Sequence, residues 1–339
     1  MKRAHRAQRN VWSVPIIVIL LAMIGGGFLF VYTFESRERA SEAERLASHD
    51  VFSLERLTIT DGDEEYVLRD DLDTYLLIGL DKYQNTLSDP VFFVNNQQCD
   101  FLFLMIVDNT RKTYSALHLN RDTMTEIIQL GAGGKRVGTT VTQLCLAHTY
   151  GSGGMDSCRN TTQAVSTLLL GVPIDHYMSI TMDGIPIIND LVGGVTVHMD
   201  DDLTMADPSF IQGKDVRLNG QQALKFVRSR DLVGNSGNLE RMNRQRVYIN
   251  ALYAKLSDKL KSDSHFGLRL SSEISDYIVS DLITDEVAVL ADKLKDYTFT
   301  SIFTISGTTG EDEETHTEFY VDEADLKQIV LYLFFTKKK

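Results

Sequence analysis

The chain has 339 residues, a formal net charge of -13, 43% hydrophobic residues and only five prolines. This composition is typical of a folded core and not of a disordered chain. The acidic balance and the lack of a zinc-finger or basic-helix motif argue against a nucleic-acid-binding protein.

The first segment with a clear physical meaning is Val14–Phe34, which contains no charged residue and has about the length needed to cross a bilayer as a helix. The residues before it carry four basic side chains and no acid, Lys2, Arg3, Arg6 and Arg9. The positive-inside rule therefore predicts a cytoplasmic tail over 1–13, a single transmembrane helix over 14–34, and an extracellular chain from Glu35 onward. A cleaved signal peptide is the alternative, but the apolar segment is long for one and no small-x-small cleavage site precedes the charged run.

Residues 35–74 are expected to form an extracellular stalk or linker. Ser41–Leu57 alternates charged and apolar residues, which predicts an amphipathic helix. Asp61–Asp73 is acidic and contains Gly62, which indicates a linker or hairpin before the core begins at Tyr75.

Strand-like and helix-like segments then alternate, and this order predicts an α/β layered domain over 75–336. The expected strands are Tyr75–Leu80, Phe101–Val107, Thr113–Leu119, Tyr177–Met182, Val195–Met199 and Ala223–Arg230. The expected helices are Thr139–Tyr150, Asp156–Leu170, Ile185–Leu191 and a long one over Leu239–Leu260. The segment 255–336 repeats a smaller strand and helix pattern and is expected to close the same domain.

The three cysteines cannot all pair within one chain. An exported domain permits a disulfide, and Cys145 with Cys158 is the pair that flanks a glycine-rich turn. The alternative is that Cys99, Cys145 and Cys158 are all small buried residues.

Five arginines fall within nineteen residues, against the acidic balance of the chain: Arg228, Arg230, Arg241, Arg244 and Arg246. On the expected strand, a spacing of two points Arg228 and Arg230 to one side. On the expected helix, Arg241 and Gln245 share a face. Because guanidinium groups bind phosphate oxygens in a bidentate way, these rows suggest a phosphate or pyrophosphate clamp. A solvated basic helix is the alternative.

Charged residues also stand at strand ends. Asp81 ends one expected strand, Asp100 precedes the next, and Arg121 and Asp122 follow the third. Two carboxylates at one edge of a sheet can hold Mg²⁺ together with water and substrate phosphate. Taken singly, the aspartates can be turn formers and Arg121 can belong to a surface ion pair. Jointly, the three strand ends and the arginine rows favour a functional site.

Several ordered blocks then resemble the LytR-CpsA-Psr family. They are LLIGLD (76–81), CDFLFLMIVD (99–108), HLNRDT (118–123), AHTYGSGG (147–154), GVPIDHYMSITMDGIPIINDLVGGVTV (171–197), NGQQALKFVRSR (219–230) and NLERMNRQR (238–246). These core motifs lie within 75–254, behind the expected membrane anchor.

The resemblance implies a layered α-β-α sandwich with a mixed central sheet and an apolar tunnel for a polyprenyl chain. It implies a transferase that moves undecaprenyl-pyrophosphate-linked glycopolymers, of teichoic acid or capsule type, onto peptidoglycan and releases undecaprenyl phosphate. The positions that match the family's site are Asp81 and Asp100 for Mg²⁺, and Arg121, Arg228, Arg230, Arg241 and Gln245 for the pyrophosphate. Arg121, Asp122, Arg228 and Arg230 are the candidate catalytic residues, with Asp122 either a general base or a support for Arg121.

Three positions depart from the family pattern: Tyr83 and Gln98 stand where arginines are common, and Asn238 where an aspartate is usual. These departures leave two other functions open, a sensor that binds a lipid pyrophosphate and a hydrolase that splits it. His118 and His148 are expected to be structural. The apolar residues of 141–169 are expected to be core, with a lipid tunnel as the alternative.

Overall fold

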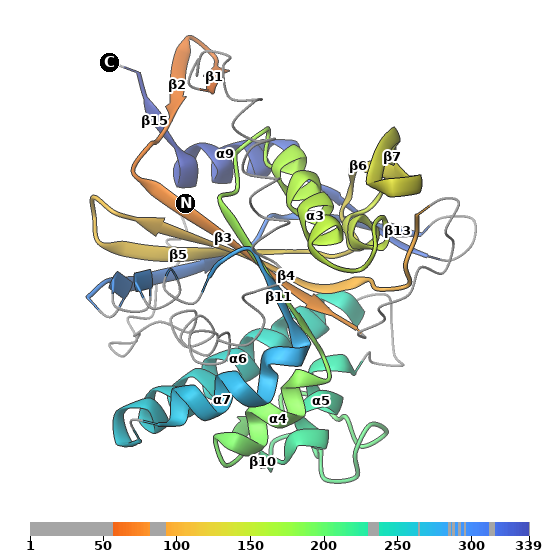
Figure 1. Ribbon diagram of the computed structural model, residues 1–339, viewed down its shortest axis with the longest axis vertical. Coiled ribbons are helices and arrows are strands. Elements are labelled where there is room, and N and C mark those ends of the chain that lie inside the picture. Colours follow the sequence, from red (N-terminus) through yellow and green to blue (C-terminus); the bar gives the residue numbers. More distant parts are fainter. Residues whose placement is uncertain are drawn as a thin grey trace, which may run out of the picture.

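The computed structural model describes residues 57–81, 93–229, 237–263, 265–283, 286, 289–290, 293–294, 296–311 and 316–338 (Figure 1). The expected membrane helix, the stalk helix up to residue 56, Tyr83 and Arg230 lie outside these residues. Within them, no helix is both long enough and apolar enough to cross a bilayer.

A six-stranded sheet forms the centre of the fold, in the order β11-β8-β3-β4-β5-β12. Its strands are β3 (Leu72–Leu80), β4 (Cys99–Asp108), β5 (Thr113–Leu119), β8 (His176–Thr181), β11 (Ile278–Ser280) and β12 (Thr298–Phe303). β4 runs antiparallel to both β3 and β5, whereas β8 is parallel to β3 and β12 is parallel to β5. The prediction of an α/β fold with a mixed central sheet is therefore confirmed.

Both faces of this sheet are covered, because alternate side chains of each central strand point to opposite sides. Leu76 and Ile78 of β3 pack with α3 (Met155–Leu168) and α9 (Glu323–Phe334) on one face. Tyr75 and Leu77 point to the other face. Helices on that side form a second core and are drawn below the sheet in Figure 1: α4 (Gly184–Leu191), α5 (Gly220–Arg228), α6 (Gly237–Ser262) and α7 (Phe266–Ile274). Burial on both faces explains why β3 and β4 read as nearly continuous apolar runs.

Smaller sheets and 3₁₀ helices surround this centre. The three-stranded sheet joins β1 (Thr58–Asp61), β2 (Glu64–Leu68) and β15 (Phe335–Lys337). The two-stranded sheets are β6 (Met124–Gly131) with β7 (Lys135–Gln143), β9 (Val195–His198) with β10 (Asp215–Leu218), and β13 (Gly307–Glu311) with β14 (Thr317–Val321). The 3₁₀ helices are η1 (Ala132–Gly134), η2 (Leu144–Thr149) and η3 (Ser275–Tyr277). The hairpin expected around Gly62 is present, with that glycine at φ 60° in the β1–β2 turn.

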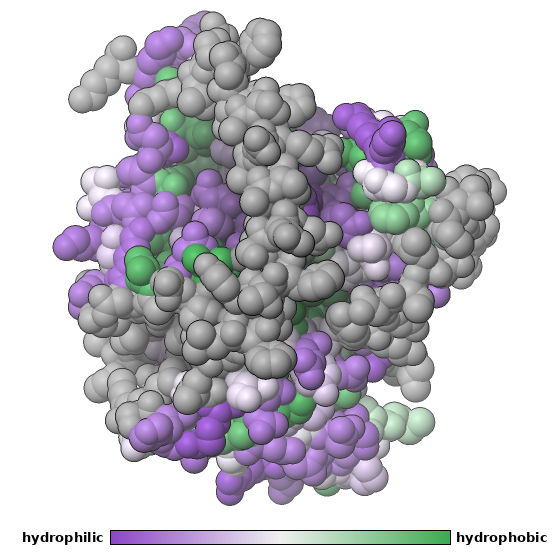
Figure 2. Space-filling view, in the orientation of Figure 1, coloured by the Kyte–Doolittle hydropathy of each residue, from purple (hydrophilic) through white to green (hydrophobic). Residues whose placement is uncertain are grey.

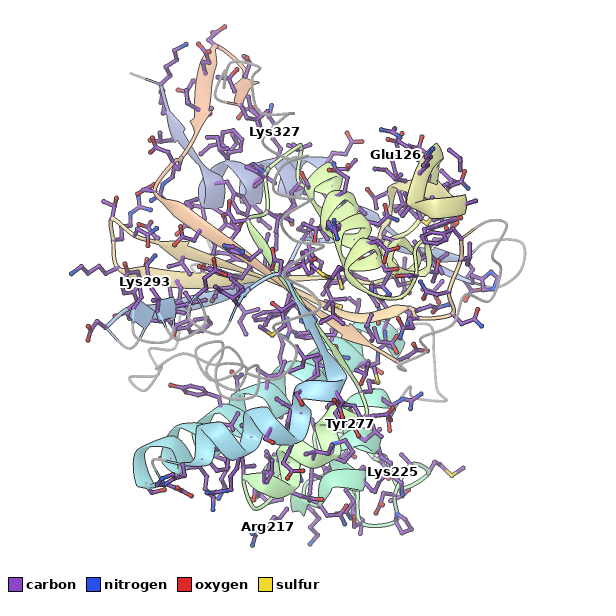
Figure 3. All side chains as sticks on the ribbon, in the orientation of Figure 1. Glu126, Arg217, Lys225, Tyr277, Lys293 and Lys327 are labelled. Carbon is purple, nitrogen blue, oxygen red and sulfur yellow. The ribbon has the colours of Figure 1, made fainter. Side chains whose placement is uncertain are left out.

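Polar side chains cover much of the described surface in the view of Figure 2. Lys225, Lys293 and Lys327, labelled in Figure 3, each form an ion pair with an aspartate. Partly exposed pairs of this kind contribute little to stability. The fold therefore rests on its apolar cores.

Two of the expected elements are wrong. Ala223–Arg230 is not a strand: residues up to Arg228 belong to α5, because Asn219 and Gln222 form a capping box in which each side chain accepts a hydrogen bond from the other's backbone N–H. The expected helix Thr139–Tyr150 is instead the end of β7 followed by η2. The β-branched run from Thr139 to Thr142 favours a strand over a helix.

The disulfide alternative is also wrong, because all three cysteines are free and buried. The apolar residues of 141–169 are mainly core, as expected: Leu144, Val165, Leu168 and Leu169 pack on the sheet, although Val141 is 65% exposed.

Candidate functional site

The charged strand ends meet at one edge of the central sheet. Asp81 follows β3, Asp100 is the second residue of β4, and Arg121 and Asp122 follow β5. Because β4 runs antiparallel to its two neighbours, its beginning and their ends share an edge. Helix α6 adds Arg241 to the same edge.

Asp100 is the centre of this cluster. Its Oδ1 accepts a hydrogen bond from Nη1 of Arg121 and lies 3.3 Å from Nη1 of Arg241. The Arg121 and Arg241 side chains are only 9% and 3% exposed. Buried charges of this kind must be paired, and here one carboxylate serves two guanidinium groups. The sequence-predicted residues Asp100, Arg121 and Arg241 are thus brought together.

The remaining donors of Arg121 fix its orientation. Nε lies 3.2 Å from Oδ1 of Asp122, while Nη2 donates to Oε1 of Gln98 at 2.8 Å and lies 3.3 Å from Sγ of Cys145. Family members often have an arginine at the position of Gln98. In this chain Gln98 adds no positive charge and instead accepts a hydrogen bond that orients Arg121. Asp122 therefore contacts Arg121 as expected for a supporting residue. Its role as a general base stays a prediction.

Asn238 orients Arg241 in the way that Gln98 orients Arg121. Its Oδ1 accepts from Nη2 of Arg241 at 2.7 Å, and its Nδ2 donates to Oδ1 of Asn120. Asn120 in turn accepts from the backbone N–H of Asp122 at 3.0 Å. An amide at position 238 can orient the guanidinium without neutralising it, so the cluster keeps more positive charge for an anion than a carboxylate there would leave.

Two carboxylates at this edge fit a hard cation. Oδ1 of Asp81 is buried and has no hydrogen-bond partner among the described residues, and Asp100 is the neighbouring carboxylate on β4. Carboxylates combined with water and substrate phosphate are the usual ligands of Mg²⁺. The part of the chain that the structure describes contains no group of three or more His, Cys, Asp or Glu residues placed to hold a metal without such help.

An apolar cavity of about 110 Å³ lies beside the cluster, between the sheet and α6. Its walls are almost entirely apolar; they include Gly79, Phe101, Ile180, Ile185, Val227, Tyr248, Ile249, Leu252 and Leu256. Gln245 stands at this wall, with its Oε1 buried and without a hydrogen-bond partner in the described chain. The family resemblance implied an apolar tunnel, but the residues that line this cavity were not predicted, although Tyr248, Leu252 and Leu256 recur at the four-residue spacing of one helical face.

The other arginines of the predicted rows differ in their surroundings where the structure describes them. Arg228 is exposed at the end of α5, and Arg230 is outside the described residues. Arg244 is buried, donates to the backbone oxygen of Ser229 and lies 3.6 Å from Asp201. The chain is helical up to Arg228, so the predicted strand that would point Arg228 and Arg230 to one side is wrong.

Burial lowers the pKa of two histidines near this edge of the sheet, His118 and His148. It lowers the pKa of His118 to about 3, with help from Arg246 and Arg241, and it lowers that of His148 to about 4. Both rings are therefore neutral at neutral pH. His148 has one ring nitrogen 3.3 Å from the backbone oxygen of Gln97, whereas Nδ1 of His118 is buried without a hydrogen-bond partner in the described residues.

Comparison with known proteins gives a consistent family match. The sequence profile of the LytR_cpsA_psr family matches residues 30–333, which confirms the resemblance drawn from the ordered blocks. The polyisoprenyl-teichoic acid–peptidoglycan teichoic acid transferase TagU of Bacillus licheniformis is 27% identical over 268 residues, covering 77% of this chain and 76% of that protein.

Solved structures share the fold. The crystal structure of TagV from B. subtilis has a TM-score of 0.56 at 22% identity, covering 78% of this chain and 97% of the other. The structure described as TagT bound to LI-WTA has the same TM-score at 20% identity, covering 78% and 90%.

Proposed function

Because the chain belongs to the LytR-CpsA-Psr family, we propose that it is a glycopolymer transferase that moves a teichoic acid polymer from a lipid carrier to peptidoglycan. We further propose that the carrier is undecaprenyl pyrophosphate. A capsule-type polymer is a second candidate substrate from the family resemblance alone.

The observation that carries the proposal is the pairing of a buried arginine cluster with an apolar cavity. Arg121 and Arg241 offer charged donors to an anion, and the cavity that Gln245 borders offers an apolar surface a short distance along α6. A lipid pyrophosphate has the same two parts, an anionic head and an apolar tail. The burial of both arginines makes their interaction with a phosphate stronger than it is in water.

In the proposed reaction, a peptidoglycan sugar hydroxyl attacks the phosphorus nearest the glycan. A new P–O bond forms to the hydroxyl oxygen, and the bond from that phosphorus to the bridging oxygen breaks. The electron pair leaves with undecaprenyl phosphate, which also takes up the hydroxyl proton. Arg121 and Arg241 stabilise the charge that builds on the phosphate oxygens during this step.

Mg²⁺ is the proposed cofactor, with Asp81 and Asp100 as its protein ligands. When bound, the ion supplies positive charge against the pyrophosphate oxygens. The unpartnered Oδ1 of Asp81 supports this assignment.

The proposed location is the cell membrane, with residues 1–13 in the cytoplasm and the catalytic domain outside. This topology holds the domain next to a lipid donor. Protease added to intact protoplasts is expected to digest the domain, and full protection would reverse the orientation.

The direct test follows a labelled polyprenyl-pyrophosphate-linked glycan into insoluble peptidoglycan, using purified protein with Mg²⁺. Coupled product is the expected result. Tight donor binding without turnover would replace the transferase by the sensor, and free glycan phosphate without coupled product would replace it by the hydrolase. Asp81→Asn is expected to raise the Mg²⁺ concentration needed for half-maximal transfer, and undiminished turnover in excess chelator would remove the metal.

A further inference from the structure

A second cavity, of about 270 Å³, adjoins the arginine cluster, because its wall includes Asn120, next to Arg121, and Met242, next to Arg241. Its walls come from the end of β5, the first turns of α6 and the segment between β12 and β14. They are His118, Asn120, Leu239, Met242, Arg246, Thr304, Ile305, Ser306, Gly307 and Phe319. We call this the β5–α6 cavity.

Strand order separates the two cavities along the sheet. The apolar cavity is bordered by residues of β8, β3 and β4, and the β5–α6 cavity by residues at the ends of β5 and β12. Asp100 is next to Phe101 of the first wall and Arg121 is next to Asn120 of the second, so the cluster adjoins both cavities. Because neighbouring strands are about 4.8 Å apart, the cavities are separated by roughly the width of a few strands.

This arrangement matches the geometry of phosphoryl transfer. The attacking and leaving oxygens lie roughly in line on opposite sides of the phosphorus. With the lipid of the leaving group in the apolar cavity and the pyrophosphate at Arg121 and Arg241, the attacking oxygen must enter from the side of the β5–α6 cavity.

The lining of the β5–α6 cavity suits a sugar. Arg246 and the hydroxyl group of Thr304 provide hydrogen-bonding groups, and the Ser306 hydroxyl, which donates to Asp325 at 2.7 Å, can still accept. Leu239 and Met242 provide an apolar surface. The cavity is smaller than typical pockets for drug-sized ligands, so its size fits one or a few sugar units at a time.

His118 adds an unused polar atom at this wall. The residue is 1% exposed, and its Nδ1 has no hydrogen-bond partner in the described part of the chain. Phe101 and Phe103 hold the imidazole ring, with centroid distances of 5.0 and 5.7 Å. A neutral imidazole nitrogen can donate or accept one hydrogen bond, depending on the tautomer, and a sugar hydroxyl can supply the partner.

We propose that the β5–α6 cavity is the binding site for the acceptor saccharide of peptidoglycan, which it holds with its hydroxyl directed at the phosphorus. This assignment rests on the proposed transferase function. It makes Arg246 and Leu239 determinants of acceptor binding, separate from the residues that bind the donor.

The test compares three variants of the full chain. Arg246→Met removes the charge and keeps the side-chain length, and Leu239→Trp fills the cavity from a position that is 47% exposed. Lys255→Met, an exposed residue of the same helix that lines neither cavity, is the matched control. The measurements are donor affinity, the KM for uncross-linked peptidoglycan glycan strands, and the transfer rate.

Arg246→Met and Leu239→Trp are each expected to raise the KM for glycan strands tenfold or more and to leave donor affinity within twofold of wild type. Lys255→Met is expected to change neither. An equal loss of donor affinity and transfer would move these residues to the donor site, and an unchanged KM in both variants would overturn the assignment.

Direct binding separates this proposal from the proposed function. Calorimetry with glycan strands alone, without donor, is expected to show binding to the wild type that weakens tenfold or more in Arg246→Met. If the wild type binds strands in this way but transfers nothing, the transferase function fails and the saccharide site stands. If strands bind wild type and variant equally, the site fails whatever the transfer assay shows. Circular dichroism of each variant checks that the fold is kept.

Discussion

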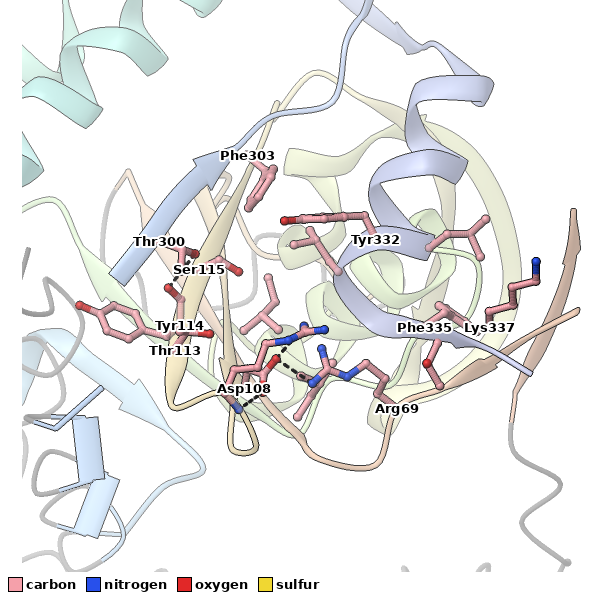
Figure 4. A pocket seen from close by; sticks show the side chains of 16 residues that line it. Arg69, Asp108, Thr113, Tyr114, Ser115, Thr300, Phe303, Tyr332, Phe335 and Lys337 are labelled. Carbon is pink, nitrogen blue, oxygen red and sulfur yellow. Dashed lines mark hydrogen bonds and ion pairs between the residues drawn. The ribbon is translucent and has the colours of Figure 1, made fainter. Parts of the chain in front are cut away.

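Strand β4 has an aspartate near each of its ends, and each aspartate contacts two arginines. The two clusters differ in how completely their polar groups are hydrogen-bonded. At one end, Asp100 meets Arg121 and Arg241. At the other, Oδ2 of Asp108 lies 2.7 Å from Arg69 and 3.1 Å from Arg111 (Figure 4). Both aspartates are buried, and a cavity adjoins each cluster.

At the Asp108 cluster, both carboxylate oxygens of Asp108 accept hydrogen bonds from surrounding residues. Oδ1 of Asp108 accepts from the backbone N–H of Arg111 at 2.7 Å, and Arg69 donates twice to Asp71, at 2.9 and 2.8 Å. These contacts close the turn after β4 and hold the chain that leads into β3. The cavity here, about 470 Å³, is larger than the two at the other end.

The Asp100 cluster is built from distant parts of the chain and is left with unused capacity. Its arginines lie 21 and 141 residues from Asp100 in sequence. Nearby, Oδ1 of Asp81 and Oε1 of Gln245 have no hydrogen-bond partner in the described chain. An unused carboxylate oxygen and an unused amide oxygen, more than charge or cavity size, therefore distinguish the candidate site from the structural cluster.

The largest expected difference is in activity. Arg121→Ala should lower transfer about a hundredfold or more, because it removes a buried donor aimed at the developing charge. Arg121→Lys should restore it only in part, since lysine lacks the bidentate fork. Arg111→Ala, the control at the other cluster, should leave transfer within twofold. Equal losses in Arg121→Ala and Arg111→Ala, measured with labelled donor, would abolish the distinction.

Stability should respond in the opposite sense. Arg69→Met should lower the free energy of unfolding by about 3 kcal/mol, because it leaves buried Asp108 with one exposed guanidinium partner. Transfer per folded molecule should stay within twofold. Urea unfolding and an activity titration on the same sample measure both quantities. A catalytic loss without a stability loss would place Arg69 in a functional site.

A smaller effect is expected at Asn238. Asn238→Ala should lower transfer about tenfold by releasing Arg241, whereas Asn238→Asp should retain most activity because a carboxylate still accepts from Nη2. Lys255→Ala, an exposed change on the same helix, is the control. Activity of Asn238→Ala equal to wild type would show that Arg241 needs no support from this residue.

The smallest effect concerns acid stability. The hydrogen bonds from Arg69 hold the pKa of Asp71 at about 2, below its ordinary value. The stabilisation is present above the ordinary pKa near 4 and is lost as the pH falls toward 2. Asp71→Asn should therefore reduce the fall of the free energy of unfolding between pH 5 and pH 3 by about 1 kcal/mol or less, as measured by urea unfolding at each pH. Asp63→Asn, an exposed change, should leave that fall as in wild type.

Local patterns predicted the centre of the fold well. β3, β4 and β5 bury both faces, so their apolar runs are unbroken and their charged ends stand out in the sequence. The same patterns failed at α5, where the short run Ala223–Val227 suits either a strand or a buried helix. The capping box of Asn219 and Gln222 was the signal that decides between them.

The candidate site was predictable as a set of residues but not as a set of contacts. The strand ends and the spacing on α6 indicated Asp100, Arg121 and Arg241. That Asn238 supports Arg241, and that Gln98 supports Arg121, depends on how α6 crosses the sheet edge, which local periodicity does not specify. Both cavities likewise arise from packing between elements distant in sequence.

The three free cysteines have a practical consequence. Burial raises the pKa of each thiol, that of Cys158 to about 12, and only the thiolate reacts readily with alkylating agents or disulfides. These thiols can therefore be labelled in the native chain only when the structure opens locally, and the labelling rate measures how often it opens. Cys145 touches Arg121, whereas Cys158 lies in α3. Comparing the labelling rates of Cys145 and Cys158 would show whether the sheet edge that carries the candidate site opens faster or slower than the helix layer.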